Sequence, residues 1–119
     1  IDPELILFVL LCSHSIAEAK KAGLATASEV FADRTYQTDG SLTPRTRSDA
    51  LITDEDTAAE QVLDMIKYGR VRSMDAIMIS IEAETVCIHG DGGRSVEFAS
   101  LIRRRLTECG IMIAAPRSI

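Results

Sequence analysis

Aromatic side chains are scarce in this chain, which contains no tryptophan and only 4% Phe, Trp and Tyr together. Apolar residues still make up 46% of its 119 residues, so the chain is expected to fold rather than stay disordered. Its core must therefore be built from Leu, Ile, Val, Ala and Met, a composition that is common in α/β proteins but does not establish that class. The length suits a single domain over residues 1–119 with one modest core.

Cysteine and histidine are also rare. The three cysteines, Cys12, Cys87 and Cys109, are odd in number and widely spaced, which argues against a disulfide framework and against a zinc site. Cys87 lies in an apolar run and Cys109 on an expected apolar helix face, so both are interpreted as small buried hydrophobic residues. A reducing cytoplasm is the simplest compartment for such a chain. Two histidines, His14 and His89, are a thin basis for a metal site.

The chain lacks an excess of positive charge and any long hydrophobic run. Its 13 basic and 18 acidic residues give a formal net charge of −5, without the electrostatic signature of nucleic-acid binding. Leu5–Leu11 is continuously apolar, but a membrane span needs about 20 residues. Asp2 and Glu4 precede this run, in place of the basic residues that open a signal peptide. We therefore expect neither nucleic acid nor a membrane as partner, and we interpret Leu5–Leu11 as a strand covered on both faces.

Hydrophobic periodicity predicts that strands and helices alternate along the first half. Ser15 and Glu18 form a capping box for a helix over Ile16–Ala22, and Thr26–Phe31 is the next expected strand. Thr53 is the expected N-cap of a second helix. The apolar stripe of that helix consists of Ala58, Ala59, Val62, Leu63 and Ile66.

The second half continues the alternation. Gly69 is the expected stop of the second helix, Ile77–Ile81 alternates like a short strand or hairpin arm, and Thr85–Ile88 is a further strand. Gly110 ends a third helix, and Ile111–Ala114 begins a last strand. The apolar face of the third helix is predicted to hold Val96, Ala99, Ile102, Leu106 and Cys109. This order predicts an α/β fold with βαβ units and mainly parallel strands.

Residues 32–52 show little periodicity. About 20 residues without structure are unusual inside a compact domain, so we expect this loop to have a function. Arg45 and Arg47 follow Pro44 in the loop and are able to clamp a carboxylate or a phosphate. The alternative is that they only solvate the loop.

A glycine-rich segment, His89-Gly90-Asp91-Gly92-Gly93, joins an expected strand to an expected helix. Glycines let the backbone approach a ligand closely, and the N-terminus of a helix offers free N–H groups to an anion. His89 is a candidate for proton transfer, and Asp91 is a candidate base or a group that orients His89. An ordinary glycine-rich turn, with Asp91 as the N-cap of the helix, explains the same segment equally well.

Two carboxylates stand near the end of the second strand. Glu29 and Asp33 are four residues apart, so they are expected on one face of an extended strand. Carboxylates beside an apolar run are costly unless they are paired or catalytic, and Arg34 is the local candidate for pairing. A salt-bridged strand end remains the alternative to a catalytic site.

Four segments together resemble one enzyme family: EVFADRTY, DGSLTPR, DMIKYGRV and TVCIHGDG. Their order and spacing are similar to those of the LamB/YcsF family, the A subunits of 5-oxoprolinase. The resemblance implies a barrel-like α/β fold related to TIM barrels and sugar deacetylases. It also implies an activity, the ATP-dependent opening of the lactam of 5-oxo-L-proline to L-glutamate together with subunits B and C. ATP with a divalent cation, Mg²⁺, is the implied cofactor.

The resemblance carries site positions onto this chain at Glu29, Asp33, Arg34, Arg45, His89, Gly90, Asp91 and Gly92. In the role assignment that we expect, His89 and Asp91 transfer protons. Arg34 and Arg45, with the glycines, hold the substrate carboxylate or a phosphate. Glu29 and Asp33 orient water or bind a cation.

The chain has half the roughly 250 residues of a complete (β/α) barrel, and it resembles the C-terminal half of the family. Ala76 and Ile77 stand where the family tends to have a glycine turn. A half barrel leaves open sheet edges, so we expect a homo-oligomer, pairing with the missing N-terminal half, or a fragment of a longer product. Two alternatives stay open: a non-catalytic assembly module, and, by fold analogy, a metal-dependent amidohydrolase or deacetylase.

Overall fold

The structure is a computed structural model, and it describes residues 2–10, 13–89 and 93–117. Within these residues the chain forms three helices and five strands, in the order β1, α1, β2, α2, β3, β4, β5, α3. Their bounds are β1 Ile6–Leu10, α1 His14–Lys21, β2 Ala25–Phe31, α2 Glu55–Tyr68, β3 Arg70–Arg72, β4 Met78–Ser80, β5 Thr85–Cys87 and α3 Ser95–Glu108. None of the helices in the described ranges is long and apolar enough to cross a membrane.

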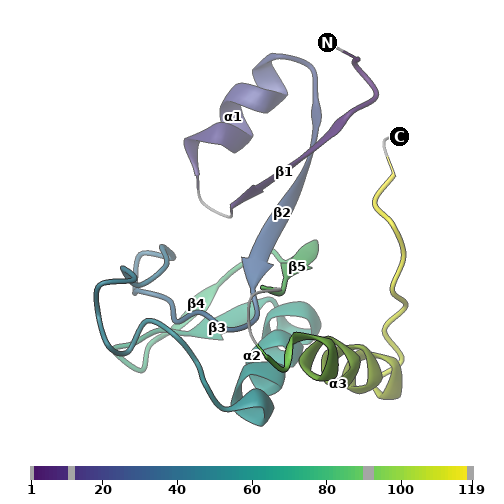
Figure 1. Cartoon of the computed structure of the whole chain (residues 1–119). Helices are drawn as coiled ribbons and strands as arrows, with labels where there is room; N and C mark the ends of the chain where they lie inside the picture. Colours follow the sequence, from purple (N-terminus) through teal and green to yellow (C-terminus); the bar gives the residue numbers. More distant parts are fainter. Residues whose placement is uncertain (1, 11–12, 90–92, 118–119) are drawn as a thin grey trace.

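Three strands form a parallel sheet in the order β1-β2-β5 (Figure 1). In its register, Glu29 of β2 lies between Leu10 of β1 and Thr85 of β5. The short strands β3 and β4 pair antiparallel as a separate hairpin. Parallel pairing through helical crossovers confirms the predicted α/β class.

The main core lies between one face of this sheet and the helices α2 and α3. Val30 of β2 and Val86 of β5 are part of it, and Val30 is fully buried. Because side chains alternate along a strand, the opposite face carries Glu29, Phe31 and Cys87. Helices on one face and functional side chains on the other are the arrangement expected of a segment of a barrel.

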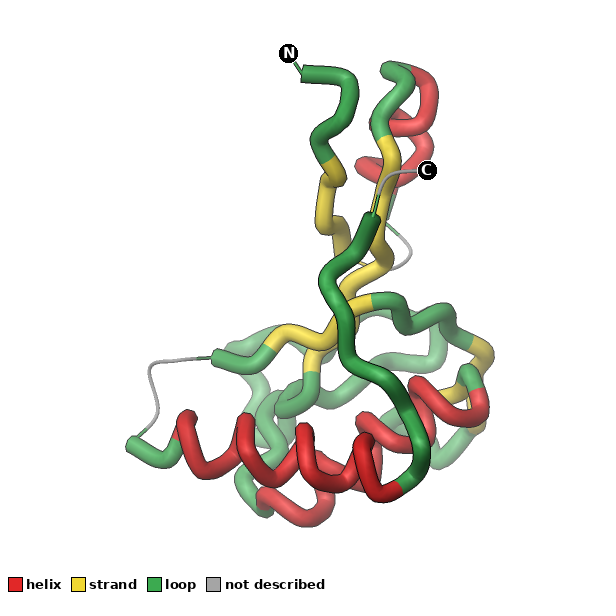
Figure 2. The backbone as a smooth tube through the Cα atoms, turned by 90° about the vertical axis from the view of Figure 1, so that its right-hand side faces the viewer, coloured by secondary structure: helices red, strands yellow, loops and turns green. Residues whose placement is uncertain are grey.

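The strand β1 is not covered on both faces, so that expectation was wrong. Val9 is buried, but Leu7, Phe8 and Leu10 are exposed, because the core formed with α2 and α3 does not extend to β1. The strand β1 also lies at the edge of the sheet in the described part of the chain. Figure 2 shows α1, β1 and the N-terminal part of β2 standing away from the layer formed by α2 and α3. The chain thus presents an unpaired apolar edge.

Two helix caps differ from expectation by one or two residues. Asp54, and not Thr53, caps α2, and its carboxylate accepts a hydrogen bond from the Thr57 N–H at 2.9 Å. The helix α1 begins at His14, so Ser15 lies inside it, and Glu18 pairs with Lys21 instead of closing a capping box. Both N-termini contain several adjacent polar residues, and sequence alone does not choose among them.

The third helix buries Ile102 and Leu106 as predicted, but the rest of the predicted apolar face is exposed. Phe98, Ile102 and Leu106 face the core at a spacing of four residues, whereas Val96, Ala99 and Cys109 are exposed. Residues Ile111–Ala114 form no strand, and the C-terminal segment leads from α3 toward the end of the molecule where the N-terminus lies (Figure 1). Cys87 is half-buried and Cys109 exposed, so the expectation of two buried cysteines was wrong for Cys109.

Candidate functional site

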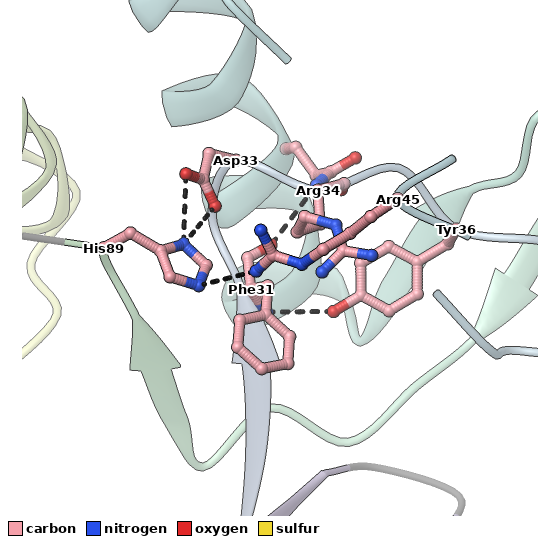
Figure 3. Close-up of polar contacts among 7 residues, drawn as sticks. Phe31, Asp33, Arg34, Tyr36, Arg45 and His89 are labelled. Carbon is pink, nitrogen blue, oxygen red and sulfur yellow. Dashed lines mark hydrogen bonds and ion pairs between the residues drawn. The ribbon is translucent and has the colours of Figure 1, made fainter. Parts of the chain in front are cut away.

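Asp33 and His89 meet at the carboxyl ends of neighbouring parallel strands, β2 and β5. His89 Nδ1 lies 3.0 Å from Asp33 Oδ1 and 3.2 Å from Asp33 Oδ2 (Figure 3). The two side chains are 24% and 28% exposed, so solvent or a ligand reaches them. Two residues 56 positions apart in the sequence are therefore brought together, as expected for strand ends in an α/β sheet.

The hydrogen bond to Asp33 determines the tautomer of His89. An ionised carboxylate only accepts hydrogen bonds, so the proton of a neutral imidazole lies on Nδ1 and the lone pair on Nε2. The Phe31 ring lies nearly parallel to the imidazole, with 8° between the planes and 5.7 Å between the centroids. The imidazole is thus oriented at one nitrogen and along one face, and Nε2 carries the lone pair that can accept a proton.

Arg45 faces that second nitrogen. Its Nη2 lies 3.5 Å from His89 Nε2, and its side chain is exposed (Figure 3). Elsewhere, arginines pair with carboxylates at Arg47, Arg70, Arg94, Arg104 and Arg105. Arg45 has no carboxylate partner in the parts of the chain that the structure describes. It is therefore an exposed cation beside a candidate base, suited to contact an anionic group.

The loop 32–52 is held by main-chain hydrogen bonds. Ile52 N donates to Asp33 O at 2.8 Å, and Thr35 N donates to Ala50 O at 3.0 Å. The side chain of Gln61, on α2, donates to the carbonyl of Arg34 at 2.9 Å. The segment that carries Asp33 is consequently fixed from the far end of the loop and from a helix.

Arg34 is buried inside this loop and does not pair with the strand carboxylates. Only 6% of it is exposed, and its Nη2 donates to the Thr43 carbonyl at 2.8 Å. Asp33 bonds to His89 instead, so the expected pairing of Arg34 with the acids of its own segment was wrong. A guanidinium can satisfy a carbonyl as well as a carboxylate, and sequence proximity does not distinguish the two.

Glu29 lies at the same end of the sheet. The strand β2 ends at Phe31 and the chain then turns, so the alternation that predicted one shared face does not extend to Asp33. Burial raises the pKa of the Cys87 thiol, and the negative charges of Glu29 and Asp33 raise it further. Both carboxylates thus lie near Cys87, and the raised pKa makes a thiolate nucleophile there unfavourable.

Gly90, Asp91 and Gly92 lie outside the described residues, so their proposed roles stay predictions. In the part of the chain that is described, no three or more His, Cys, Asp or Glu side chains are arranged to hold a metal ion. Mg²⁺ needs only one or two carboxylates when phosphate oxygens complete its shell, and Glu29 and Asp33 offer such oxygens at this end of the sheet. The interpretation as a metal-dependent hydrolase stays a prediction that metal analysis of the purified protein tests.

A cavity of about 750 Å³ lies between α3, β5 and the C-terminal segment. Its lining includes the apolar side chains Val86, Ile102, Leu106 and Ile113, with His89 also contributing. Val86, Ile102 and Leu106 belong to the core on the helix side of the sheet, away from the face with Glu29 and Phe31. The cavity is lined mainly by apolar side chains, and the polar site is the Asp33–His89–Arg45 cluster, which shares His89 with the cavity.

Sequence reasoning missed three supporting residues. Tyr36 Oη accepts a hydrogen bond from Phe31 N at 2.9 Å and so fixes the end of β2. Phe31 and Tyr36 both occur in the EVFADRTY segment, so that segment was a usable signal for them. Gln61 gave no signal, because one polar residue on an amphipathic helix is ordinary.

The sequence model of the LamB/YcsF family matches residues 1–119. The 5-oxoprolinase A subunit of Bacillus licheniformis is 54% identical over 114 residues, which are 96% of this chain and 45% of that protein. The corresponding protein of Bacillus subtilis is 50% identical over 97% of this chain and 45% of its own length. The crystal structure of a lactam utilization protein from Thermus thermophilus matches with a TM-score of 0.90 and 36% identity, covering 97% of this chain and 45% of that one. The chain therefore spans less than half the length of these relatives.

Proposed function

We infer the function of this chain from its family, because the chain belongs to the LamB/YcsF family, and we propose that it is part of the A subunit of a 5-oxoprolinase. In this proposal the complete protein, with subunits B and C, opens the lactam of 5-oxo-L-proline to L-glutamate in the cytoplasm and consumes ATP. The names of the curated relatives and of the structural match support the assignment. The single structural observation that carries it is the hydrogen bond from His89 to Asp33.

Lactam hydrolysis needs a group that takes a proton from water and returns it to the ring nitrogen when the C–N bond breaks. His89 fits this requirement, because Asp33 accepts a hydrogen bond from its Nδ1–H, so that Nε2 carries the lone pair that can take the water proton. ATP, with Mg²⁺, would supply the activation, because transfer of its terminal phosphoryl group to the lactam oxygen would make the poorly reactive amide carbon electrophilic. ADP would be released, and the phosphoryl group would leave as inorganic phosphate once water has added and the C–N bond has broken. Arg45 stands beside Nε2, where a cation can bind the substrate carboxylate.

The test is glutamate release from 5-oxoproline and ATP by the full-length A subunit together with subunits B and C. His89→Ala and Asp33→Asn are each expected to lower kcat by about 10²- to 10⁴-fold, the usual contribution of a positioned acid–base group. His14→Ala is the matched control, since His14 is the exposed first residue of α1. Full activity of both site variants would refute the assigned roles.

A second candidate function is assembly, and the exposed apolar edge of β1 favours it. An uncovered strand with Leu7, Phe8 and Leu10 at its surface is a template for pairing with another chain. In this case the 119-residue chain forms a stable oligomer, or binds the rest of a barrel, without turnover of its own. Gel filtration with light scattering tests this second function by measuring the mass of the chain in solution. A stable folded monomer would contradict assembly through β1.

A further inference from the structure

We propose that Arg34 is a positioning residue, and that its buried guanidinium holds the backbone at Thr43 so that Arg45 stands at His89 Nε2. The inference rests on the proposed function for the role of Arg45 and His89. It separates two arginines that the family resemblance groups together. Arg34 acts on the loop, and Arg45 acts on the ligand.

The surroundings of Arg34 close it to any ligand. The residue is 6% exposed, forms an isolated bridge with Leu51, and receives the Gln61 side chain on its carbonyl. Its Nη2 donates to the Thr43 carbonyl at 2.8 Å, and its Nε is buried without a hydrogen-bond partner in the described residues. Burial of a guanidinium against a single carbonyl is costly. We attribute the burial of Arg34 to its contact with the loop backbone at Thr43.

Thr43 is held at both of its main-chain groups. Its N–H donates to the Thr35 carbonyl at 3.0 Å, and its own carbonyl accepts from Arg34. Thr43 is fully buried, whereas Pro44 and Arg45 are exposed. Because proline restricts its own φ and the conformation of the residue before it, the fixed position of Thr43 is passed on to Arg45.

Two adjacent residues therefore control the two nitrogens of one imidazole. Asp33 binds Nδ1 of His89 directly at 3.0 Å. Arg34 acts on Nε2 through Thr43, Pro44 and Arg45, whose Nη2 lies 3.5 Å from that nitrogen. Loss of the Arg34 contact should misplace Arg45 while leaving the bond between His89 and Asp33 in place.

A double-mutant cycle on the full-length protein, measured together with subunits B and C, tests this coupling. Arg45→Gln and Arg34→Met are each expected to raise the KM for 5-oxoproline about tenfold. In the Arg45→Gln background, Arg34→Met should change KM less than twofold, because the residue that Arg34 positions is already gone. Arg34→Lys should recover part of the KM, since an ammonium can also donate to the Thr43 carbonyl.

Other outcomes overturn the proposal. Multiplicative effects of Arg34→Met and Arg45→Gln on KM would mean that Arg34 contacts the ligand itself. A lower melting temperature with unchanged KM would mean that its role is structural only. Pro44→Gly is the second variant in case Arg34→Met fails to fold, because it loosens the same segment at an exposed position. Pro44→Gly is likewise expected to raise KM in the wild-type protein and to change it less than twofold in the Arg45→Gln background. An equally large change of KM in both backgrounds would contradict the proposal.

Nitrogen NMR of the His89 imidazole separates this inference from the proposed function. Arg45→Gln and Arg34→Met should shift the Nε2 resonance in the same direction and leave the Nδ1 resonance unchanged. Arg47→Gln is the matched control, since Arg47 lies on the same loop but pairs with Asp49 at 2.7 Å. If the wild-type protein releases no glutamate, the function fails, and the Nε2 shifts alone decide whether Arg34 positions Arg45. An Nε2 resonance that responds to Arg45→Gln but not to Arg34→Met refutes the coupling.

Discussion

Glu84 and Ser28 bind each other through two hydrogen bonds at the entry to β5. Glu84 N donates to Ser28 O at 3.0 Å, and Ser28 N donates to the Glu84 side-chain Oε1 at 3.2 Å. These contacts lie one residue before the pair Glu29–Thr85, with which the β2–β5 register begins. They help to specify that register, and a slip of one residue would move His89 to the other face of the sheet.

Replacement of Glu84 tests this contact. Glu84→Ala is expected to lower the free energy of unfolding by about 1–2 kcal/mol, because Ser28 N–H loses its acceptor at a buried position. Glu84→Gln should lower the free energy of unfolding by less, since its amide oxygen can still accept the hydrogen bond from Ser28 N. Urea unfolding measures both, with the exposed Glu82→Ala as control. Equal losses in all three variants would contradict a specific role for Glu84.

The turn between β3 and β4 contains a strained alanine. Ala76 has φ of 60°, where a Cβ atom is unfavourable, and its N–H donates to Ser73 O at 2.9 Å. The strands β3 and β4 still pair in antiparallel register, although an alanine occupies this position of positive φ. Ala76→Gly should therefore raise the free energy of unfolding by about 0.5–1 kcal/mol.

The same substitution at a second alanine serves as the control, because it is expected to change the free energy of unfolding in the opposite direction. Ala99 is exposed within α3, where Ala→Gly should cost about 1 kcal/mol. Thermal or urea unfolding of both variants compares the two sites under one set of conditions. A loss of stability at Ala76 as well as at Ala99 would show that the positive φ is not a source of strain.

Gly69 ends α2 with φ of 62°, and an added Cβ would lie 3.3 Å from the Ile81 carbonyl oxygen. Gly69→Ala should lower the free energy of unfolding by about 1–2 kcal/mol, because the left-handed conformation disfavours any side chain. Gly93→Ala is the control, since a Cβ there meets nothing within 4 Å. Denaturant midpoints measure the difference, and a neutral Gly69→Ala would argue against the left-handed cap.

The cap of α2 should make stability depend on pH. The hydrogen bonds from the Thr57 side chain and backbone lower the pKa of Asp54 below its usual 3.8. A folded-state pKa below the unfolded one gives stability that is present above about pH 4 and is lost as the pH falls through the folded-state pKa. Asp54→Asn should therefore be less stable than the wild type at pH 6, with the difference shrinking toward pH 3.

Unfolding measured across that pH range checks the sign. The matched variant is Asp56→Asn, in the first turn of the same helix, because the Asp56 carboxylate contacts Arg105 and does not cap the helix. A wild-type advantage over Asp54→Asn that grows on acidification would contradict the lowered pKa of Asp54.

The sequence alone determined the features that depend on neighbouring residues. The stripe that includes Ala58, Ala59 and Val62 predicted the buried face of α2, and Gly69 predicted its end. The family motifs marked Asp33 and His89 in advance, and parallel strand ends predicted that they converge. Helical periodicity, turn chemistry and strand-end position are local properties, so they can be recognised without coordinates.

Only the tertiary structure decided what depends on contacts between distant segments. That Phe98, and not Val96 or Ala99, completes the buried face of α3 depends on where α2 lies, because several apolar faces were possible. The exposure of Phe8 on β1 depends on which strands and helices are present to cover it. The burial of Arg34 depends on a loop that folds back through Thr43, since hydrogen bonds between distant residues leave no periodic pattern in a sequence.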